Sequence, residues 1–349
     1  MGLFSKVGLG IDIGTTSIKV VELVQTGGVA KLSGYGILEN YAHLERINGA
    51  IQTSSFKIVE KNTAQYLTNL LKQSKIKSRE ANISVPPFYT YMNLIELPIL
   101  NRKELEQAVH YQARQYVPIS LNDVILDWQV VKQTDTRLYV LLSAVPKDII
   151  ATYTTIGRLA NIKIKSIELE VVSQVRSLLK NERGLVALVD IGGRVTSIAI
   201  VDEGIPQLMR TIDTAGGDLT QVVATGLAIS PIRAEEIKRL YGLASPRGQE
   251  DITRIMLPLL GVIKQEILRE ISNFNKKTNR IVEKMYLTGG IANLPGIIDD
   301  FMRDLRIQVI KGDPFSLNIV NYDKIIEPVI KEIGTSLSCA CGLALREFK

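Results

Sequence analysis

The chain contains 349 residues, of which 46% are hydrophobic, so it is long enough to bury the cores of two domains. Its 42 Lys and Arg residues against 36 Asp and Glu residues give a mildly basic, dispersed balance, which argues against nucleic-acid binding. The two cysteines, Cys339 and Cys341, are one residue apart, and only two histidines are present, so neither a disulfide framework nor a zinc site is expected. No apolar run reaches the roughly 18 residues of a membrane span, and residues 1–6 do not resemble a signal peptide, so we expect a cytoplasmic protein.

The first predicted element is a tight β-hairpin at residues 10–23, in which an apolar strand, an Asp-x-Gly turn and a β-branched strand follow one another. Backbone N–H groups of such a turn, with hydroxyl and ammonium groups nearby, form a concave donor set that suits phosphate oxygens. The carboxylate would face a phosphate only with a cation such as Mg²⁺ between them. Taken alone, the pattern favours a hairpin without a ligand, and the second copy described below changes that interpretation. The candidate residues are Asp12, Gly14, Thr15, Thr16 and Lys19.

The following segments predict the rest of a first lobe and an inserted module. Strands at 31–39 and 81–85 flank a helix at 57–73, and the double proline at 86–87 ends this unit. From residue 89 to residue 166 the pattern predicts a small α+β module. Its predicted strands are 91–97, 124–132, 137–145 and 162–167, and its predicted helices are 102–116 and 147–160.

A second hairpin of the same kind is predicted at residues 186–200, after a helix at 171–180. Its Asp-x-Gly turn repeats the first one about half a chain later, which predicts a duplicated α/β domain. If the two turns face each other, they can hold a polyphosphate between them. The candidate residues of the second turn are Asp190, Gly192, Gly193 and Arg194.

Two further glycine pairs are candidate ligand contacts. Gly216 and Gly217 precede a polar helix start, where free backbone N–H groups would suit a ribose or phosphate edge, although an ordinary helix entry explains them equally well. Gly289 and Gly290 directly follow a predicted strand and leave a flat surface at its carboxyl end, where an adenine ring could lie.

Two predicted helices in the second half of the chain have features that can be compared with the structure. Glu235 and Lys238 lie three residues apart on one helix, so they share a face, and the default expectation is an exposed ion pair. A long helix at 252–275 is expected to be interrupted at Pro258 and Gly261.

The ordered set of motifs resembles the superfamily of actin, heat-shock chaperone and sugar kinase ATPases. The set comprises two Asp-x-Gly hairpins, a Gly-Gly-Asp turn, a Glu-x-x-Lys helix, a Thr-Gly-Gly turn and a small-residue helix at 334–346. The resemblance implies an α/β, actin-like fold, a ribonuclease H-like duplicated two-domain ATPase with an FtsA-type inserted α+β subdomain. It implies a first lobe at 1–88 with 167–183 and about 331–349, an insertion at 89–166, a second lobe core at 184–216 with about 282–330, and its subdomain at 217–281.

The resemblance also implies roles for the candidate residues toward MgATP. Both turns would bind phosphates, with Asp12 and Asp190 holding Mg²⁺ through water. The candidate catalytic residues are Glu170, placed to orient the attacking water, and Asp190. The remaining implied contacts are Gly216 and Gly217 on the ribose side, Gly289 and Gly290 against the adenosine, and Glu235 and Lys238 beside the base.

Within the superfamily, the chain resembles the PilM family of type IV pilus and related secretion machines. The resemblance rests on Val-Pro-Pro at 85–87, Leu-Pro-x-Leu at 97–100, the helix end Gln-Tyr-Val-Pro-Ile at 115–119, the opening Met-Gly-Leu-Phe-Ser-Lys and the close at 341–346. It implies that the protein grips the N-terminal cytoplasmic tail of a PilN-like inner-membrane protein and couples it to motor and platform components. The protein would then be peripheral at the inner face of the cytoplasmic membrane, and self-association is possible.

One departure from the superfamily bears on hydrolysis. Arg194 stands where chaperone ATPases carry a third glycine, and Ser197 stands where they carry a further aspartate. Loss of a carboxylate should slow metal-assisted hydrolysis, so we expect MgATP binding with slow or partner-dependent turnover. The alternatives are a filament-forming protein of the FtsA or MreB type and, less favoured, a sugar kinase-type phosphotransferase.

Overall fold

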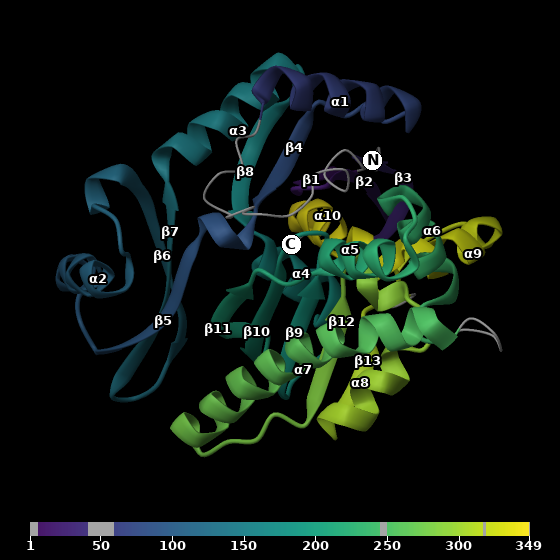
Figure 1. Cartoon of the computed structure of the whole chain (residues 1–349). Helices are drawn as coiled ribbons and strands as arrows, with labels where there is room; N and C mark the ends of the chain where they lie inside the picture. The colour runs from purple at the N-terminus through teal and green to yellow at the C-terminus, as the bar shows by residue number, and fades with distance from the viewer. Residues whose placement is uncertain (1–5, 41–58, 245–249, 317–318, 349) are drawn as a thin grey trace.

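The computed structural model describes residues 6–40, 59–244, 250–316 and 319–348. The chain forms two lobes, each built on one β-sheet, with a small three-stranded module beside them (Figure 1). The Met-Gly-Leu-Phe-Ser start and the first residues of the helix predicted at 57–73 lie outside the described residues. None of the helices within the described ranges is both long and apolar enough to cross a membrane.

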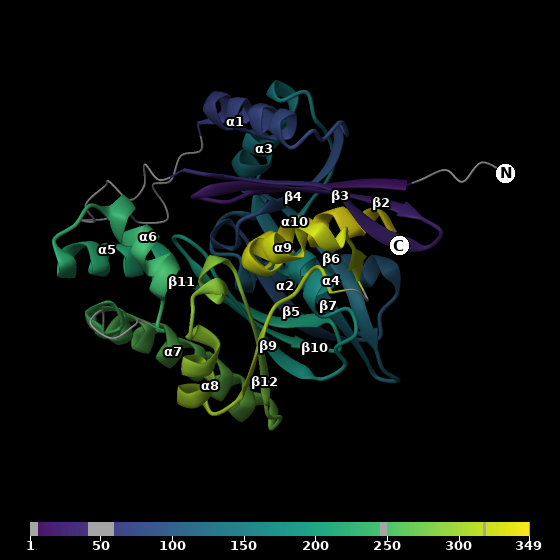
Figure 2. The ribbon, with the colours of Figure 1, turned by 90° about the vertical axis from the view of Figure 1, so that its right-hand side faces the viewer.

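The first lobe has a six-stranded sheet with the strand order β14-β3-β2-β1-β4-β8. β1, β2 and β3 form an antiparallel meander, while β4 pairs in parallel with β1 and with β8. Figure 2 shows α1 (Glu60–Gln73) and α3 (Lys147–Leu159) on one face of this sheet and α10 (Ser338–Leu345) on the other. The strands are β1 (Lys6–Ile13), β2 (Ser17–Thr26), β3 (Val29–Glu39), β4 (Glu80–Val85), β8 (Lys163–Leu169) and β14 (Val320–Asn321).

Alternation along β1 explains why two helical layers fit against it. Leu9 and Ile11 point into the core under α1 and α3 and are almost fully buried. Gly10 points to the opposite face, where a Cβ would lie only 1.9 Å from the Ala340 carbonyl oxygen of α10. The absence of a side chain therefore lets α10 lie directly on the strand.

The second lobe repeats the first. Its sheet has the order β11-β10-β9-β12-β13, in which β9, β10 and β11 are antiparallel and β12 and β13 run parallel to β9. This arrangement corresponds to β3-β2-β1-β4-β8 of the first lobe, so the predicted duplicated α/β fold is confirmed. The strands are β9 (Leu185–Ile191), β10 (Thr196–Asp202), β11 (Ile205–Ile212), β12 (Lys284–Thr288) and β13 (Gln308–Lys311).

The module between the two halves is a separate sheet with the order β5-β7-β6, covered on one face by α2 (Arg102–Tyr116). Its strands are β5 (Tyr91–Pro98), β6 (Val124–Gln133) and β7 (Arg137–Pro146). The helix α3 (Lys147–Leu159) instead packs its buried Tyr153 and Ile156 into the first-lobe core, and β8 pairs with β4. The separate sheet and α2 therefore come from residues 91–146, whereas the module expected from the sequence was residues 89–166.

The remaining helices lie between or around the sheets, with α4 and α10 packed against each other between the lobes. The expected interruption of the helix at 252–275 is wrong, because α7 is one helix of 29 residues that includes Pro258. Burial of Met256 and Leu260 in the second-lobe core offsets the cost of a proline inside a helix. The helices not yet given are α4 (Glu170–Leu178), α5 (Gly216–Leu227), α6 (Pro231–Tyr241), α7 (Glu250–Thr278), α8 (Ile297–Leu305) and α9 (Glu327–Ile333).

Candidate functional site

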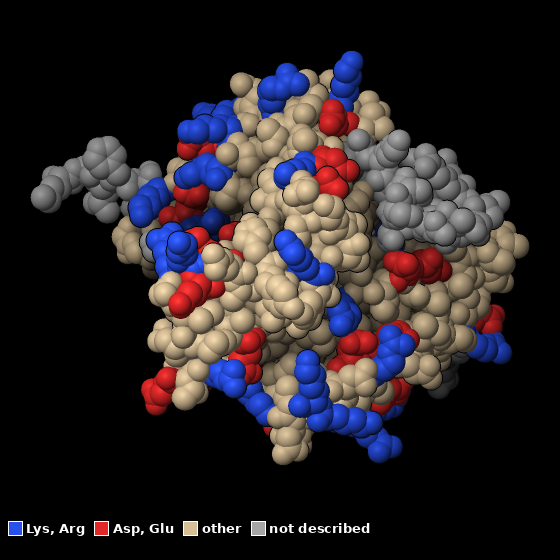
Figure 3. Space-filling view, turned by 90° about the vertical axis from the view of Figure 1, so that its left-hand side faces the viewer, with Lys and Arg blue, Asp and Glu red and all other residues tan. Residues whose placement is uncertain are grey.

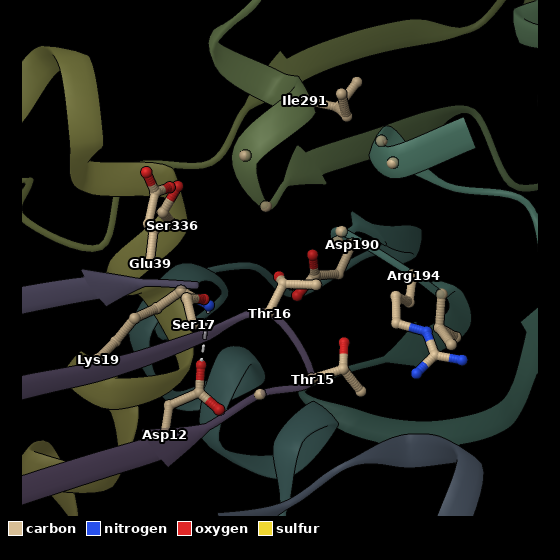
Figure 4. A pocket seen from close by; sticks show the side chains of 18 of the residues that line it. Asp12, Thr15, Thr16, Ser17, Lys19, Glu39, Asp190, Arg194, Ile291 and Ser336 are labelled. Carbon is tan, nitrogen blue, oxygen red and sulfur yellow. Dashed lines mark hydrogen bonds and ion pairs between the residues drawn. The ribbon is translucent and has the colours of Figure 1, made fainter. Parts of the chain in front are cut away.

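A cavity of about 280 Å³ lies between the two lobes, and all the candidate residues from the sequence line it. Figure 4 shows part of its lining, including Asp12, Lys19 and Asp190. They reach it from the two hairpin turns, the starts of α4 and α5, the helix α6 and the end of β12. Residues up to 278 positions apart are thus brought to one place. These residues are Asp12, Gly14, Thr15, Thr16, Lys19, Glu170, Asp190, Gly192, Gly193, Arg194, Gly216, Gly217, Glu235, Lys238, Gly289 and Gly290.

The two Asp-x-Gly turns have the same local structure. The N–H of Gly14 donates to the carbonyl oxygen of Ser17 at 2.9 Å, and the N–H of Gly192 donates to that of Val195 at 3.1 Å. The turns also touch each other, because a Cβ on Gly193 would lie 2.5 Å from the Thr16 hydroxyl oxygen. The hydroxyl-bearing turn of one lobe and the glycine-rich turn of the other therefore meet across the cavity.

Asp12 lies at the carboxyl end of β1 and is held on both oxygens. Ser84 of β4 donates its hydroxyl to Oδ1 at 2.9 Å, and the Lys19 ammonium group lies 3.2 Å from Oδ2 (Figure 4). Burial opposes the charge on Lys19, but the carboxylates of Asp12, Asp190 and Glu170 prevail and raise its pKa above the usual value. Lys19 therefore stays charged inside the cavity.

Asp190 and Glu170 complete an acidic cluster around Lys19. The side-chain amide of Gln174 on α4 donates to Asp190 Oδ2. Burial raises the pKa of Glu170 well above its usual value, and the negative charges of Asp12 and Asp190 add to this effect. Burial also raises the pKa of Asp190, against the opposing effects of Lys19 and Gln174. Three carboxyl groups thus surround one lysine, and burial together with repulsion from the neighbouring carboxylates favours the protonated forms of Glu170 and Asp190.

The residues of the site determine whether a magnesium ion could bind there and how. Within the described parts of the chain, no group of three or more His, Cys, Asp or Glu side chains is placed to hold a metal ion. Mg²⁺, however, commonly keeps several waters and binds through one or two carboxylates and the phosphates of a nucleotide. A divalent cation near the two turns would favour the charged forms of these carboxyl groups, because opposite charge stabilises a carboxylate. The residues therefore fit a water-bridged magnesium ion and do not form an all-protein cage.

The start of α5 differs from the sequence expectation. The N–H groups of Gly216 and Gly217 are not free, because they donate to the carbonyl oxygens of Gly192 and Gly193 at 2.9 and 2.8 Å. These bonds satisfy two of the orphan donors at the helix start and fix the second turn against α5. The glycines line the cavity, and their N–H groups hold the protein's own loop.

The pair of Glu235 and Lys238 also differs from the expected exposed ion pair, because Lys238 is buried and Glu235 is partly buried. The Lys238 side chain is 3% exposed, and its Nζ lies 2.6 Å from Glu235 Oε2. Nζ also donates to the Gly216 carbonyl and to the Thr220 hydroxyl, both at 2.8 Å, so acceptors are present for all three ammonium protons. Burial opposes ionisation of Glu235, but Lys238 and neighbouring donors hold the pKa of Glu235 at about 2. Lys238 thus anchors α6 to the start of α5.

The two glycines after β12 have different environments. Gly289 has φ of +84°, and a Cβ there would lie 2.2 Å from Asp190 Oδ1. Gly290 faces open space, since the nearest heavy atom to its Cβ would be Ser336 Oγ at 4.0 Å. Gly289 is therefore required by the protein itself, while Gly290 leaves room on the cavity side.

Sequence reasoning missed several residues that line the same cavity. Ser17 directly follows the Thr-Thr pair and could have been found by reading the turn one residue further. The segment 86–88 follows β4, whose carboxyl end lies beside that of β1, so the rule that ligands lie at carboxyl strand ends also points to it. The others come from distant elements and leave no local signal. They include Glu39, Asn40, Arg239, Asn293, Glu332, Ser336 and Cys339.

Two lobes with one shared strand order, whose Asp-x-Gly turns meet at one cavity, define an actin-like ATPase fold. The chain belongs to the family of the type IV pilus assembly protein PilM, whose family model matches residues 10–348. Among solved structures, the PilM-PilN type IV pilus biogenesis complex is similar, with 22% identity, 98% of each chain covered and a TM-score of 0.82. MreB 5 of Spiroplasma citri bound to AMPPNP is similar with 14% identity, 97% of this chain and 94% of that chain covered, and a TM-score of 0.50.

A curated relative, the cell division protein FtsA of Bacillus subtilis, is 28% identical over 127 residues. The match covers 34% of this chain and 29% of FtsA, so the chain spans less than a third of this relative. The fold class and the family resemblance predicted from the sequence are thus confirmed. The roles of the individual site residues stay predictions.

Proposed function

We propose that this protein is an ATP-loaded adaptor of the type IV pilus inner-membrane platform. The observation that carries the proposal is the meeting of the two turns at a cavity with an acidic cluster, in a chain of the PilM family. A nucleotide that contacts both lobes stabilises the arrangement in which the lobes are close, because it binds that arrangement more tightly.

In the proposed complex, the triphosphate lies between the turns at residues 12–19 and 190–196. Asp12 and Asp190 hold Mg²⁺ through water, and Mg²⁺ neutralises phosphate charge when bound. Glu170 belongs to the same cluster and would orient a water molecule. Ser197 lies opposite Asp190 in the β9–β10 ladder and adds no carboxylate, which supports slow or partner-dependent hydrolysis.

The proposed partner is the cytoplasmic tail of a PilN-like membrane protein, and its proposed binding surface is the module. The structure that resembles this chain most extensively among those described above is a PilM-PilN complex. The module exposes large apolar side chains around α2, among them Tyr111 at 64% and Tyr116 at 47%. Figure 3, which looks onto this side of the molecule, shows broad uncharged areas with scattered charges of both signs. Such a surface suits an extended, partly apolar peptide, and the adaptor would be peripheral at the membrane through it.

Calorimetric titration with a synthetic tail peptide tests the adaptor function. We expect the tail to bind, and we expect the double substitution Tyr111→Ala and Tyr116→Ala to weaken binding at least about tenfold, since aromatic anchors carry much of such interfaces. Tyr66→Ala on α1 is the matched control, because Tyr66 is similarly exposed on the first lobe, and it should have no effect. A tail that does not bind, with or without MgATP, contradicts the adaptor function.

The proposed position of the base is tested by Gly290→Ala. The added methyl group has space in the protein, so stability should change little, but it would occupy the flat surface proposed for adenine. We expect the affinity for ATP, measured with a fluorescent analogue, to fall about tenfold while the melting temperature stays within a few degrees. Unchanged affinity would place the base elsewhere.

A further inference from the structure

An ion pair joins the two lobes at the exposed side of the cavity. Glu39 is the last residue of β3 in the first lobe, and Arg239 lies on α6 beside the second lobe, 200 residues later. Arg239 Nη2 donates to Glu39 Oε1 at 2.7 Å and Nη1 donates to Oε2 at 3.1 Å, so the contact is bidentate. Both residues line the cavity.

Arg239 is also connected to the second turn through a series of polar contacts within the second lobe. Arg239 Nε donates to Glu235 Oε1 at 2.7 Å, and the other oxygen of Glu235 pairs with the buried Lys238. Lys238 donates to the carbonyl oxygen of Gly216, whose own N–H holds Gly192 of the second turn. A continuous path of polar contacts therefore runs from the end of β3 to the second turn.

The exposed fractions of the side chains show that the Glu39–Arg239 ion pair lies at the rim of the cavity. The side chains of Arg239 and Glu39 are 50% and 32% exposed, whereas that of Asp12 is 6% exposed. The lobes thus touch at two places that line the cavity, between Thr16 and Gly193 of the two turns and between Glu39 and Arg239 at the rim. Because Glu39 and Arg239 line the cavity and join the lobes, the lobes can separate along this side only when their contact opens.

We propose that the Glu39–Arg239 ion pair is a gate that controls the rate at which the nucleotide enters and leaves the cavity. This inference rests on the proposed nucleotide-binding function. A partly exposed ion pair is weak and is screened by salt, so it can open on its own and suits a gate better than a permanent clamp. Because the gate acts on entry and exit alike, it changes both rate constants and leaves the equilibrium affinity nearly unchanged.

Stopped-flow binding of a fluorescent ATP analogue with Mg²⁺ tests the gate. Glu39→Gln should raise both the association and the dissociation rate constants about three- to tenfold and leave Kd within about twofold. Arg239→Gln should do the same, and the double substitution Glu39→Gln with Arg239→Gln should raise the rate constants no further than either single substitution. Asp251→Asn is the matched control, because it removes the exposed Arg254–Asp251 pair within α7 and should change neither rate constant.

Two results would overturn the gate. A rise in Kd through faster dissociation alone, with a further rise in the double substitution, would show that Glu39 contacts the nucleotide directly. Unchanged rate constants in Glu39→Gln would show that the pair does not limit exchange. If the unmodified protein binds no nucleotide, the proposed function fails, and amide hydrogen exchange of the nucleotide-free protein then decides the gate. The gate requires faster exchange in α6 and at the end of β3 for Glu39→Gln, and equal exchange would refute it.

Discussion

Replacing Gly342 by alanine is expected to lower the free energy of unfolding by about 2–3 kcal/mol, which is at the upper end of the usual cost of overpacking. Gly342 lies in α10, where a Cβ would be 1.8 Å from the Ser173 carbonyl oxygen of α4. Both partners of this contact are backbone groups of packed helices, so neither can move aside alone. Arg176 also donates to the Gly342 carbonyl at 2.8 Å, which fixes the register of the two helices.

Urea denaturation followed by circular dichroism measures this effect, and Gly261→Ala serves as its control. Gly261 lies in α7 with open space where its Cβ would be, so alanine there should stabilise the protein by about 0.5–1 kcal/mol through helix propensity. Opposite signs for the two substitutions would separate the close approach of α10 and α4 from the general preference for alanine in helices. Equal stabilisation by both would mean that α10 and α4 can separate at little cost.

Local patterns predicted most of the elements and the position of the cavity. The two hairpins were predictable because their apolar strands and Asp-x-Gly turns are contiguous in sequence, and the duplication then indicated that the turns face each other. The continuity of α7 was not predictable, because the burial that outweighs the effect of Pro258 involves residues of β9, β10 and β12. Secondary-structure propensity is routinely overridden by such tertiary packing.

Contacts between residues far apart in the sequence account for the other differences between the sequence predictions and the structure. The strand β8 joins β4 through contacts such as Glu80 with Lys163, and no local signal tells that this strand leaves the inserted module. The spacing of Glu235 and Lys238 shows that they share a helix face, but not that this face packs on the start of α5. The ion pair of Glu39 with Arg239 joins residues from different lobes and could be found only in the folded chain.

Neutralising either aspartate of the acidic cluster is expected to weaken binding of MgATP by about 10- to 100-fold, the usual cost of losing a group that holds a metal through its outer shell. Asp12→Asn and Asp190→Asn keep the size of the side chain and remove one negative charge. Because the charge near the phosphates decreases, binding of ATP without Mg²⁺ should be unchanged or tighter. Each substitution should therefore weaken ATP binding only when Mg²⁺ is present.

Calorimetric titration of each variant with ATP, in excess Mg²⁺ and then in excess chelator, measures both effects. Asp299→Asn is the control, because Asp299 is exposed on α8 and does not line the cavity, and it should change neither affinity. Thermal unfolding without nucleotide separates loss of binding from loss of structure, which matters for Asp12 because Lys19 and Ser84 contact it. Equal losses with and without Mg²⁺ would remove both aspartates from the metal role and assign them to holding the turns in place. Unchanged affinity for MgATP in both variants would contradict the proposal that the two turns grip a magnesium-bound triphosphate.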